Sequence, residues 1–213
     1  DVCSSDLSKW PDAPKSAMTE TCQSDHKAVF FSTCVGKTFS SNQSENDARE
    51  LKDVLISLMN KANITMIDAS QLSPCCGLPY KSQGLFDIAE TKGASLVAYL
   101  QELSENGRYP VVFDASPCVE QILPLLPKHI RTYDACGFVD HFVKPQLTIT
   151  PKSETITLHV PCSSQKMGLS DTMISLAQAC VDEVIVPNDI ECCGFAGSKG
   201  FIQPEINRSE EHT

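Results

Sequence analysis

Seven cysteines in this sequence form two sets whose residue types and spacing suit metal binding through sulfur. The first set is Cys34, Cys75, Cys76 and Cys118, and the second is Cys162, Cys192 and Cys193. Each set contains an adjacent pair followed by glycine, and adjacent cysteines are poor partners for an ordinary disulfide. Soft thiolates are the usual ligands of iron-sulfur clusters. We therefore expect the first set to hold a cluster, with [4Fe-4S] as the expected type, and the second to supply three further ligands.

Zinc is the alternative occupant, because four thiolates also suit a closed tetrahedral zinc site. The paired zinc knuckle, in which two residues separate two cysteines, is absent from the sequence. Ligand softness and arrangement therefore favour a cluster over zinc. Cys136 and Cys180 lie outside the repeated pattern, and we expect both to be packing residues.

Glycines and lysines follow the cysteines and are candidates for tuning the site. Gly77 and Gly194 would let the backbone adopt positive φ and bring amides close to a cluster. A lysine follows each cysteine element, namely Lys37, Lys81, Lys166 and Lys199. Positive charge lowers thiol pKa values and raises a cluster's reduction potential, although each lysine alone is an ordinary surface residue. No catalytic residue is predicted.

Strands and helices must position these cysteines, and the apolar patterns predict them in alternation. Strands are expected at 28–32, 64–67, 110–114, 155–160 and 183–186, and helices at 45–62, 83–105 and 172–180. Alternating order implies parallel strands with right-handed crossovers, and ligands of such sheets gather at the carboxyl ends of strands. The sequence therefore predicts an α/β fold made of two tandem Rossmann-like modules with parallel sheets.

The two predicted modules span residues 27–145 and 154–207, preceded by a linker at 8–26. The separation of Cys34 from Cys75 is 41 positions, against 30 from Cys162 to Cys192, and an inserted loop or helical turn would absorb the difference. The counterpart of Cys118 in the second module would fall beyond the last residue. The second module is therefore expected to be truncated.

Both ends of the sequence are expected to be artefact. Residues 1–7 and 208–213 correspond to translations of one common sequencing adapter in opposite orientations, so we exclude them from the fold. The segment RSEEHT, for example, is the translation of AGATCGGAAGAGCACACG.

Composition restricts the classes of partner. A formal net charge of -10 without a cluster of Lys and Arg argues against nucleic acid. The apolar runs fall far short of the roughly 20 residues that a bilayer demands, so no transmembrane segment is expected. The cysteine arrangement favours a reducing, cytoplasmic compartment.

Four motifs resemble those of the cysteine-rich CCG domain family. They are SPCCGLP at 73–79, DASPC at 114–118, HVPCSS at 159–164 and ECCGFAG at 191–197. Such domains occur in a subunit of heterodisulfide reductase, in iron-sulfur subunits of glycolate oxidase and anaerobic glycerol-3-phosphate dehydrogenase, and in bacterial FAD-linked D-lactate dehydrogenases. The sequence around the second pair is most similar to the D-lactate dehydrogenases. Ala115 stands where the heterodisulfide reductase pattern has a cysteine, so a simple four-thiolate cluster is expected.

The resemblance implies an electron-transfer region of an oxidoreductase that acts on a CH-OH group. It implies an FAD-containing domain upstream in the parent chain and a quinone or cytochrome acceptor, with location in the cytoplasm or peripherally at the inner face of the bacterial inner membrane. The chain alone is expected to be inactive. The alternatives are a separate iron-sulfur subunit of a glycolate oxidase, glycerol-3-phosphate dehydrogenase or heterodisulfide reductase type complex, and a structural metal-binding domain.

Overall fold

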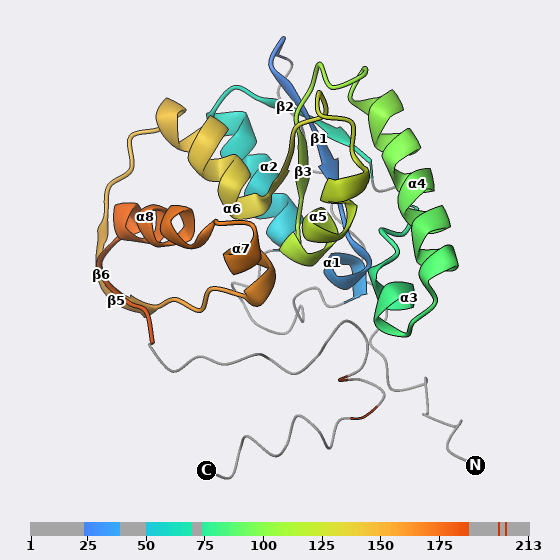
Figure 1. Ribbon diagram of the computed structural model, residues 1–213. Helices are drawn as coiled ribbons and strands as arrows, with labels where there is room; N and C mark the ends of the chain where they lie inside the picture. The colour runs from blue at the N-terminus through green and yellow to red at the C-terminus, as the bar shows by residue number, and fades with distance from the viewer. Residues whose placement is uncertain (1–23, 39–49, 70–73, 188–199, 201–202, 204–213) are drawn as a thin grey trace.

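A four-stranded parallel sheet forms the centre of the first part of the chain (Figure 1). The structure is a computed structural model and describes residues 24–38, 50–69, 74–187, 200 and 203. The strands are β1 (Lys27–Phe31), β2 (Thr65–Asp68), β3 (Val111–Phe113) and β4 (Thr132–Asp134). They are ordered β2-β1-β3-β4, and every neighbouring pair is parallel. The predicted α/β class with parallel strands is confirmed.

Side chains of β1 alternate between two hydrophobic clusters on opposite faces of the sheet. Val29 and Phe31 belong to one cluster, and Ala28 and Phe30 belong to the other. The alternation follows from the two-residue period of a strand. Burial of the larger side chains, those of Val29, Phe30 and Phe31, stabilises the fold by about 1.5–3 kcal/mol each. Because all four are buried, β1 is a central strand and fixes the register of its neighbours.

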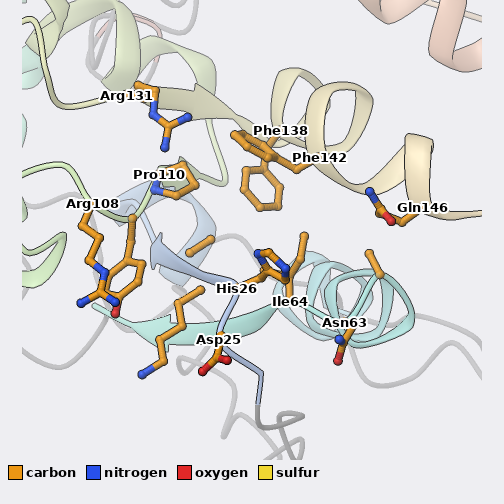
Figure 2. Close-up of a pocket in the computed structure, with 14 residues that line it drawn as sticks. Asp25, His26, Asn63, Ile64, Arg108, Pro110, Arg131, Phe138, Phe142 and Gln146 are labelled. Atoms are coloured by element: carbon orange, nitrogen blue, oxygen red, sulfur yellow. The ribbon is translucent and has the colours of Figure 1, made fainter.

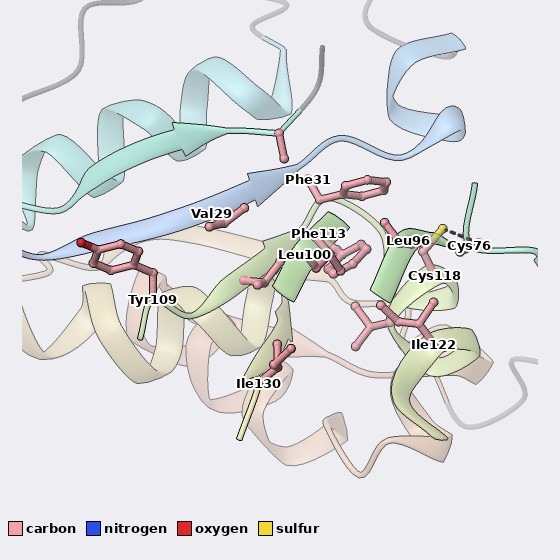
Figure 3. Packing of buried hydrophobic residues seen from close by; sticks show 13 residues of the cluster. Val29, Phe31, Cys76, Leu96, Leu100, Tyr109, Phe113, Cys118, Ile122 and Ile130 are labelled. Carbon is pink, nitrogen blue, oxygen red and sulfur yellow. Dashed lines mark hydrogen bonds between the residues drawn. The ribbon is translucent and has the colours of Figure 1, made fainter. Parts of the chain in front are cut away.

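Helices cover both faces of this sheet. The cluster containing Val29 is covered by α4 (Phe86–Leu103) and α5 (Ser116–Ile122), as Figure 3 shows. The opposite cluster is covered by α2 (Leu51–Lys61), α6 (Ala135–Phe138) and the π-helical turn η3 (Val139–Val143). The remaining short helices are α1 (Cys34–Thr38), α3 (Leu78–Ser82), α7 (Cys162–Lys166) and the 3-10 turns η2 (Leu123–Leu125) and η4 (Lys144–Gln146).

The later part of the chain repeats the element order of the first. A strand β5 (Lys152–Thr157) is followed by α7, by α8 (Ser170–Cys180) and by the parallel strand β6 (Val181–Ile185). The series β1, α1, α2, β2 has the same order, and α2 and α8 each contain 11 residues. Twelve residues separate α1 from α2, whereas three separate α7 from α8. This connection accounts for most of the difference in cysteine spacing.

Several predicted element boundaries were wrong. Within the helix predicted at 45–62, the structure has α2 at Leu51–Lys61, and residues 45–49 lie outside the described ranges. The helix predicted at 83–105 corresponds to α4 at Phe86–Leu103, and the short helix α3, which was not predicted, ends before it at Ser82. Gly84 has a φ of +79°, which a continuous α-helix does not allow. β5 begins at Lys152 and ends at Thr157, so it lies earlier than the predicted 155–160. No helix within the described ranges combines the length and apolar character needed to cross a membrane.

Candidate metal centre

The first set of cysteines lies at the carboxyl ends of three neighbouring strands. Cys34 follows β1, the pair Cys75 and Cys76 follows β2, and Cys118 follows β3. In the order β2-β1-β3-β4, the chain connections leave β1 and β3 in opposite directions. Ligands of open α/β sheets bind at such a switch point, outside the carboxyl ends of the strands. The fold therefore brings the four cysteines to the carboxyl ends of the strands, where parallel sheets bind their ligands.

Two of these cysteines are buried and in direct contact. The Cys76 thiol donates a hydrogen bond to Cys118 Sγ across 3.2 Å (Figure 3). Cys76 is 3% exposed and Cys118 is 6% exposed. Both belong to the hydrophobic cluster that α4 and α5 form on this face of the sheet. The hydrogen bond to Cys118 raises the pKa of Cys76 to about 12, and burial acts in the same direction. Both sulfurs are thus shielded from water.

The other two cysteines lie beside this pair. The neighbouring Cys76 thiol raises the pKa of Cys75, as does burial, while the charge of Lys92 on α4 opposes them. Burial raises the pKa of Cys34, and so does the nearby Cys75 thiol. These thiols are neutral in the metal-free protein because ionised sulfurs at such close range would repel one another. A cationic centre would remove that penalty and release their protons.

Gly77 gives the vicinal pair its backbone conformation. Its φ is +90°, and a Cβ at this position would overlap the backbone carbonyl oxygen of Ala89 on α4. The Gly77 amide donates to Cys75 Sγ at 3.4 Å. The turn therefore needs glycine for two reasons, and it directs a backbone amide at a candidate ligand.

A carboxylate that the sequence reasoning missed holds the loop before Cys34. Asp114, directly after β3, accepts hydrogen bonds from the Thr33 amide at 2.9 Å and from the Ser32 hydroxyl at 2.9 Å. In the sequence Asp114 stands out only as part of the motif around Cys118. The sequence held no signal for this role, because the Ser32 hydroxyl and the Thr33 amide lie more than 80 positions earlier in the chain.

The candidate tuning lysines have other partners. Lys81 on α3 donates to Gln121 at 3.1 Å, and Lys166 on α7 pairs with Glu120 at 3.2 Å. Both partners belong to α5, so these lysines link α5, the helix that carries Cys118, to α3 and to α7. Lys37 is in α1, next to the site in sequence. Lys92 was not a predicted residue, yet its charge acts on Cys75.

Only part of the second set of cysteines falls within the described residues. Cys162 is exposed and begins α7, which packs against α5. The next residue, Ser163, shares a buried 2.7 Å hydrogen bond with Ser116 of α5. Residues 192–194 and 199 lie outside the described ranges, so the predicted roles of Cys192, Cys193, Gly194 and Lys199 remain expectations.

The two cysteines outside the pattern differ in environment. Cys136 is half-buried, and burial raises its pKa. Cys180 is exposed at the end of α8, so the prediction that it is a packing residue was wrong. The prediction rested on the position of Cys180 outside the repeated cysteine pattern, and the chain enters β6 directly after it.

The donor set suits a cluster of several iron atoms. Four thiolates, drawn here from three chain segments that follow neighbouring strands, are the ligands that iron-sulfur clusters require. Among the residues that the structure describes, no three His, Cys, Asp or Glu side chains are grouped so as to hold a single metal ion. A cluster makes a different demand, because each thiolate binds a different iron atom. In number and in type, the four free thiols fit such a group.

A separate pocket lies at the opposite end of the sheet (Figure 2). Its volume is about 440 Å³, and its lining includes His26, Arg108, Arg131 and Phe142. The guanidinium of Arg131 lies 5.9 Å from the centre of the Phe142 ring. The pocket is at the amino ends of β1 and β3, so it is remote from the cysteines.

Comparison with known proteins identifies related sequences for much of this chain. A family model described as a cysteine-rich domain, CCG, matches residues 28–122. One subunit of the anaerobic glycerol-3-phosphate dehydrogenase of Escherichia coli (strain K12) is 24% identical over 168 residues, covering 73% of this chain and 42% of the relative. Lactate utilization protein A of Oceanobacillus iheyensis is 26% identical over 157 residues, covering 67% of this chain and 63% of the relative.

The chain thus spans less than two thirds of the length of either relative. No solved structure matches it.

Proposed function

Residues 28–122 belong to the cysteine-rich CCG domain family, and on this premise we propose that the chain transfers electrons through an iron-sulfur cluster. The observation that carries the proposal is the gathering of four cysteines at the switch point of a parallel sheet. The proposed ligands are Cys34, Cys75, Cys76 and Cys118, and the proposed cluster is [4Fe-4S]. When bound, such a cluster supplies one-electron oxidation and reduction.

The range of solvent exposure among the four cysteines supports an electron-transfer role. Cys76 and Cys118 are buried, whereas Cys34 is exposed. The ligand set thus extends from the hydrophobic core to the surface. The buried side excludes water, which limits oxidation of the thiolates. The exposed side is where a redox partner can approach closely.

Anaerobic reconstitution tests this function directly. The purified chain should bind iron and sulfide and show a visible charge-transfer absorption band that dithionite bleaches. Bound zinc without a visible band would support the structural metal-binding alternative instead. A chain that binds neither metal after reconstitution would exclude both.

We propose further that the parent is an oxidoreductase acting on a hydroxyl group, with D-lactate as the first candidate substrate. The similarity to a lactate utilization protein supports this choice. FAD in a separate domain of the parent chain would accept hydride from lactate, and a quinone or cytochrome would accept the electrons. We place the protein in the cytoplasm or peripherally at the inner face of the bacterial inner membrane. Membrane fractionation of the parent tests the location.

A second candidate is a separate subunit of a glycerol-3-phosphate dehydrogenase, and the similarity to one subunit of that enzyme supports it. The two candidates differ in where the flavin is bound. A reading frame for an FAD-binding domain continuous with this chain selects the first candidate. The substrate can also be tested with the reconstituted chain and the flavoprotein of the parent enzyme. Bleaching of the cluster by D-lactate, and not by glycerol 3-phosphate, would also select the first candidate.

We also propose that residues 154–207 form a second cysteine-rich module with Cys162, Cys192 and Cys193 as ligands. The repeated order of strand, short helix, long helix and parallel strand supports it. Cys75 lies seven positions after the end of β2 at Asp68, and Cys192 lies seven positions after the end of β6 at Ile185. A partial loss of bound iron in Cys162→Ser, compared with the wild-type chain, would support this second site.

A further inference from the structure

Asp114 connects the loop before Cys34 to the end of β3. Its Oδ1 accepts the Thr33 amide at 2.9 Å, while Oδ2 accepts the Ser32 hydroxyl at 2.9 Å and lies 3.1 Å from the same amide. Both carboxylate oxygens are thus engaged by the two residues that precede Cys34. Charge-assisted hydrogen bonds of this kind are about twice as strong as neutral ones.

The loop fits closely over this carboxylate. A Cβ at Gly36 would overlap Asp114 Oδ2, so the first turn of α1 lies directly against the acid. Thr33 also caps that turn, because its hydroxyl accepts the Gly36 amide at 3.2 Å. Thr33 is 1% exposed and Ser32 is 8% exposed. The clamp is therefore largely shielded from water, which makes its hydrogen bonds hard to replace.

The same carboxylate links the two chain segments that carry the proposed ligands Cys34 and Cys118. Asp114 is four residues before Cys118, at the start of the connection from β3 to α5. The loop that it clamps delivers Cys34 from β1, the strand that pairs with β3. A single side chain therefore sets the position of the Cys34 loop relative to the Cys118 helix.

We propose that Asp114 is a positioning residue that fixes the Cys34 loop for cluster binding and whose negative charge lowers the reduction potential of the cluster. The effect on the potential rests on the proposed electron-transfer function, whereas the clamp on the loop does not. Both carboxylate oxygens are hydrogen-bonded to the two residues that directly precede Cys34, so the negative charge of Asp114 lies close to this proposed ligand. Negative charge near a cluster opposes the gain of an electron.

Two variants separate position from charge. Asp114→Ala removes the clamp, so the full chain should bind several-fold less iron than wild type after anaerobic reconstitution. Asp114→Asn keeps an oxygen for the Thr33 amide but removes the charge, so its cluster should form and its midpoint potential should shift in the positive direction. Asp140→Asn is the matched control. Asp140 lies in η3 and pairs with Lys144 at the start of η4, so removal of its charge should leave the iron content and the midpoint potential unchanged.

Amide hydrogen exchange tests the clamp without any cluster. In the metal-free protein the Thr33 amide should exchange faster in Asp114→Ala than in wild type, while core amides of β1 keep their protection. Unchanged Thr33 exchange, or wild-type iron content in Asp114→Ala, overturns the positioning role. A potential in Asp114→Asn equal to that of wild type overturns the role of the charge. If the wild-type chain binds no iron but Thr33 exchange is still faster in Asp114→Ala, the proposed function is contradicted and the clamp on the loop is supported.

Discussion

Ser116 Oγ and Ser163 Oγ lie 2.7 Å apart in a buried hydrogen bond that joins the helix carrying Cys118 to the helix beginning at Cys162. Ser116 is 8% exposed and Ser163 is 2% exposed. This bond holds two of the proposed ligand-bearing segments in a fixed relation, although the segments belong to the two different predicted modules, 27–145 and 154–207.

Truncation of either serine should destabilise the chain. Ser116→Ala leaves the Ser163 hydroxyl buried without its partner, which costs about 1–3 kcal/mol. The double variant should be less destabilised than the sum of the single variants, with a coupling of about 1 kcal/mol. Urea unfolding of the four proteins measures this coupling. Strict additivity would mean that the two hydroxyls do not stabilise each other in solution.

Removal of a proposed ligand should release iron in a position-dependent way. Cys75→Ser should lose most of the bound iron, because an alcohol is a poor ligand for a site that requires soft thiolates. Cys180→Ser is the matched control, since Cys180 is exposed at the end of α8. Iron and sulfide analysis after anaerobic reconstitution compares the two. Equal iron in both variants would reject the assignment of Cys75.

The metal-free protein should lose stability as the pH rises from about 9 to about 12. A thiol in the unfolded chain loses its proton near 9.0, whereas the contact with Cys118 raises the pKa of Cys76 to about 12. Across this interval the folded form binds more protons, so each increase in pH favours unfolding. Chemical denaturation at several pH values measures the slope.

Cys76→Ser provides the control for this pH dependence, because its hydroxyl does not titrate in the interval. The slope of stability against pH should therefore be shallower in the variant than in the wild type. Identical slopes would show that Cys76 does not set the alkaline loss of stability.

Gly77 should tolerate substitution less well than Gly84, although both have positive φ. Alanine costs about 1–2 kcal/mol in such a conformation. At Gly77 the new Cβ would also overlap the carbonyl oxygen of Ala89, whereas nothing lies within 4 Å of a Cβ at Gly84. Gly77→Ala should thus have the lower urea midpoint and the lower iron content. Equal midpoints in the two variants would contradict the close approach at Gly77.

Sequence patterns predicted the central strands but missed the smallest elements. β1, β2 and β3 were predicted within a residue or two, because their apolar runs are bounded by polar or turn residues. β4 was missed, since Thr132–Asp134 is too short to show a period and forms a strand through its pairing with β3. The short helices α1 and α7 likewise contain too few residues for a helical pattern.

For the candidate site, spacing identified the cysteines but not the groups around them. Cys34, Cys75 and Cys118 follow strands, and parallel order sends strand ends to one edge. Asp114 could not be assigned its role in this way, because its partners are more than 80 positions earlier in the chain. The contacts of the lysines were equally unpredictable from spacing: Lys81 bonds Gln121 and Lys166 pairs with Glu120, and the proposed tuning role of these lysines stays a prediction.

The parallel pairing of β1 with β3 has a consequence for the folding rate. Val29 pairs with Val111, so the chain must close a loop of about 80 residues before this ladder forms. Long-range parallel pairing is slow, and it leaves apolar strands exposed in the meantime. Until the ladder closes, the helices α1 and α5, which carry Cys34 and Cys118, are not held side by side at the carboxyl ends of paired strands. Assembly of the proposed cluster must therefore wait for this ladder, with the thiols open to oxidation during the delay.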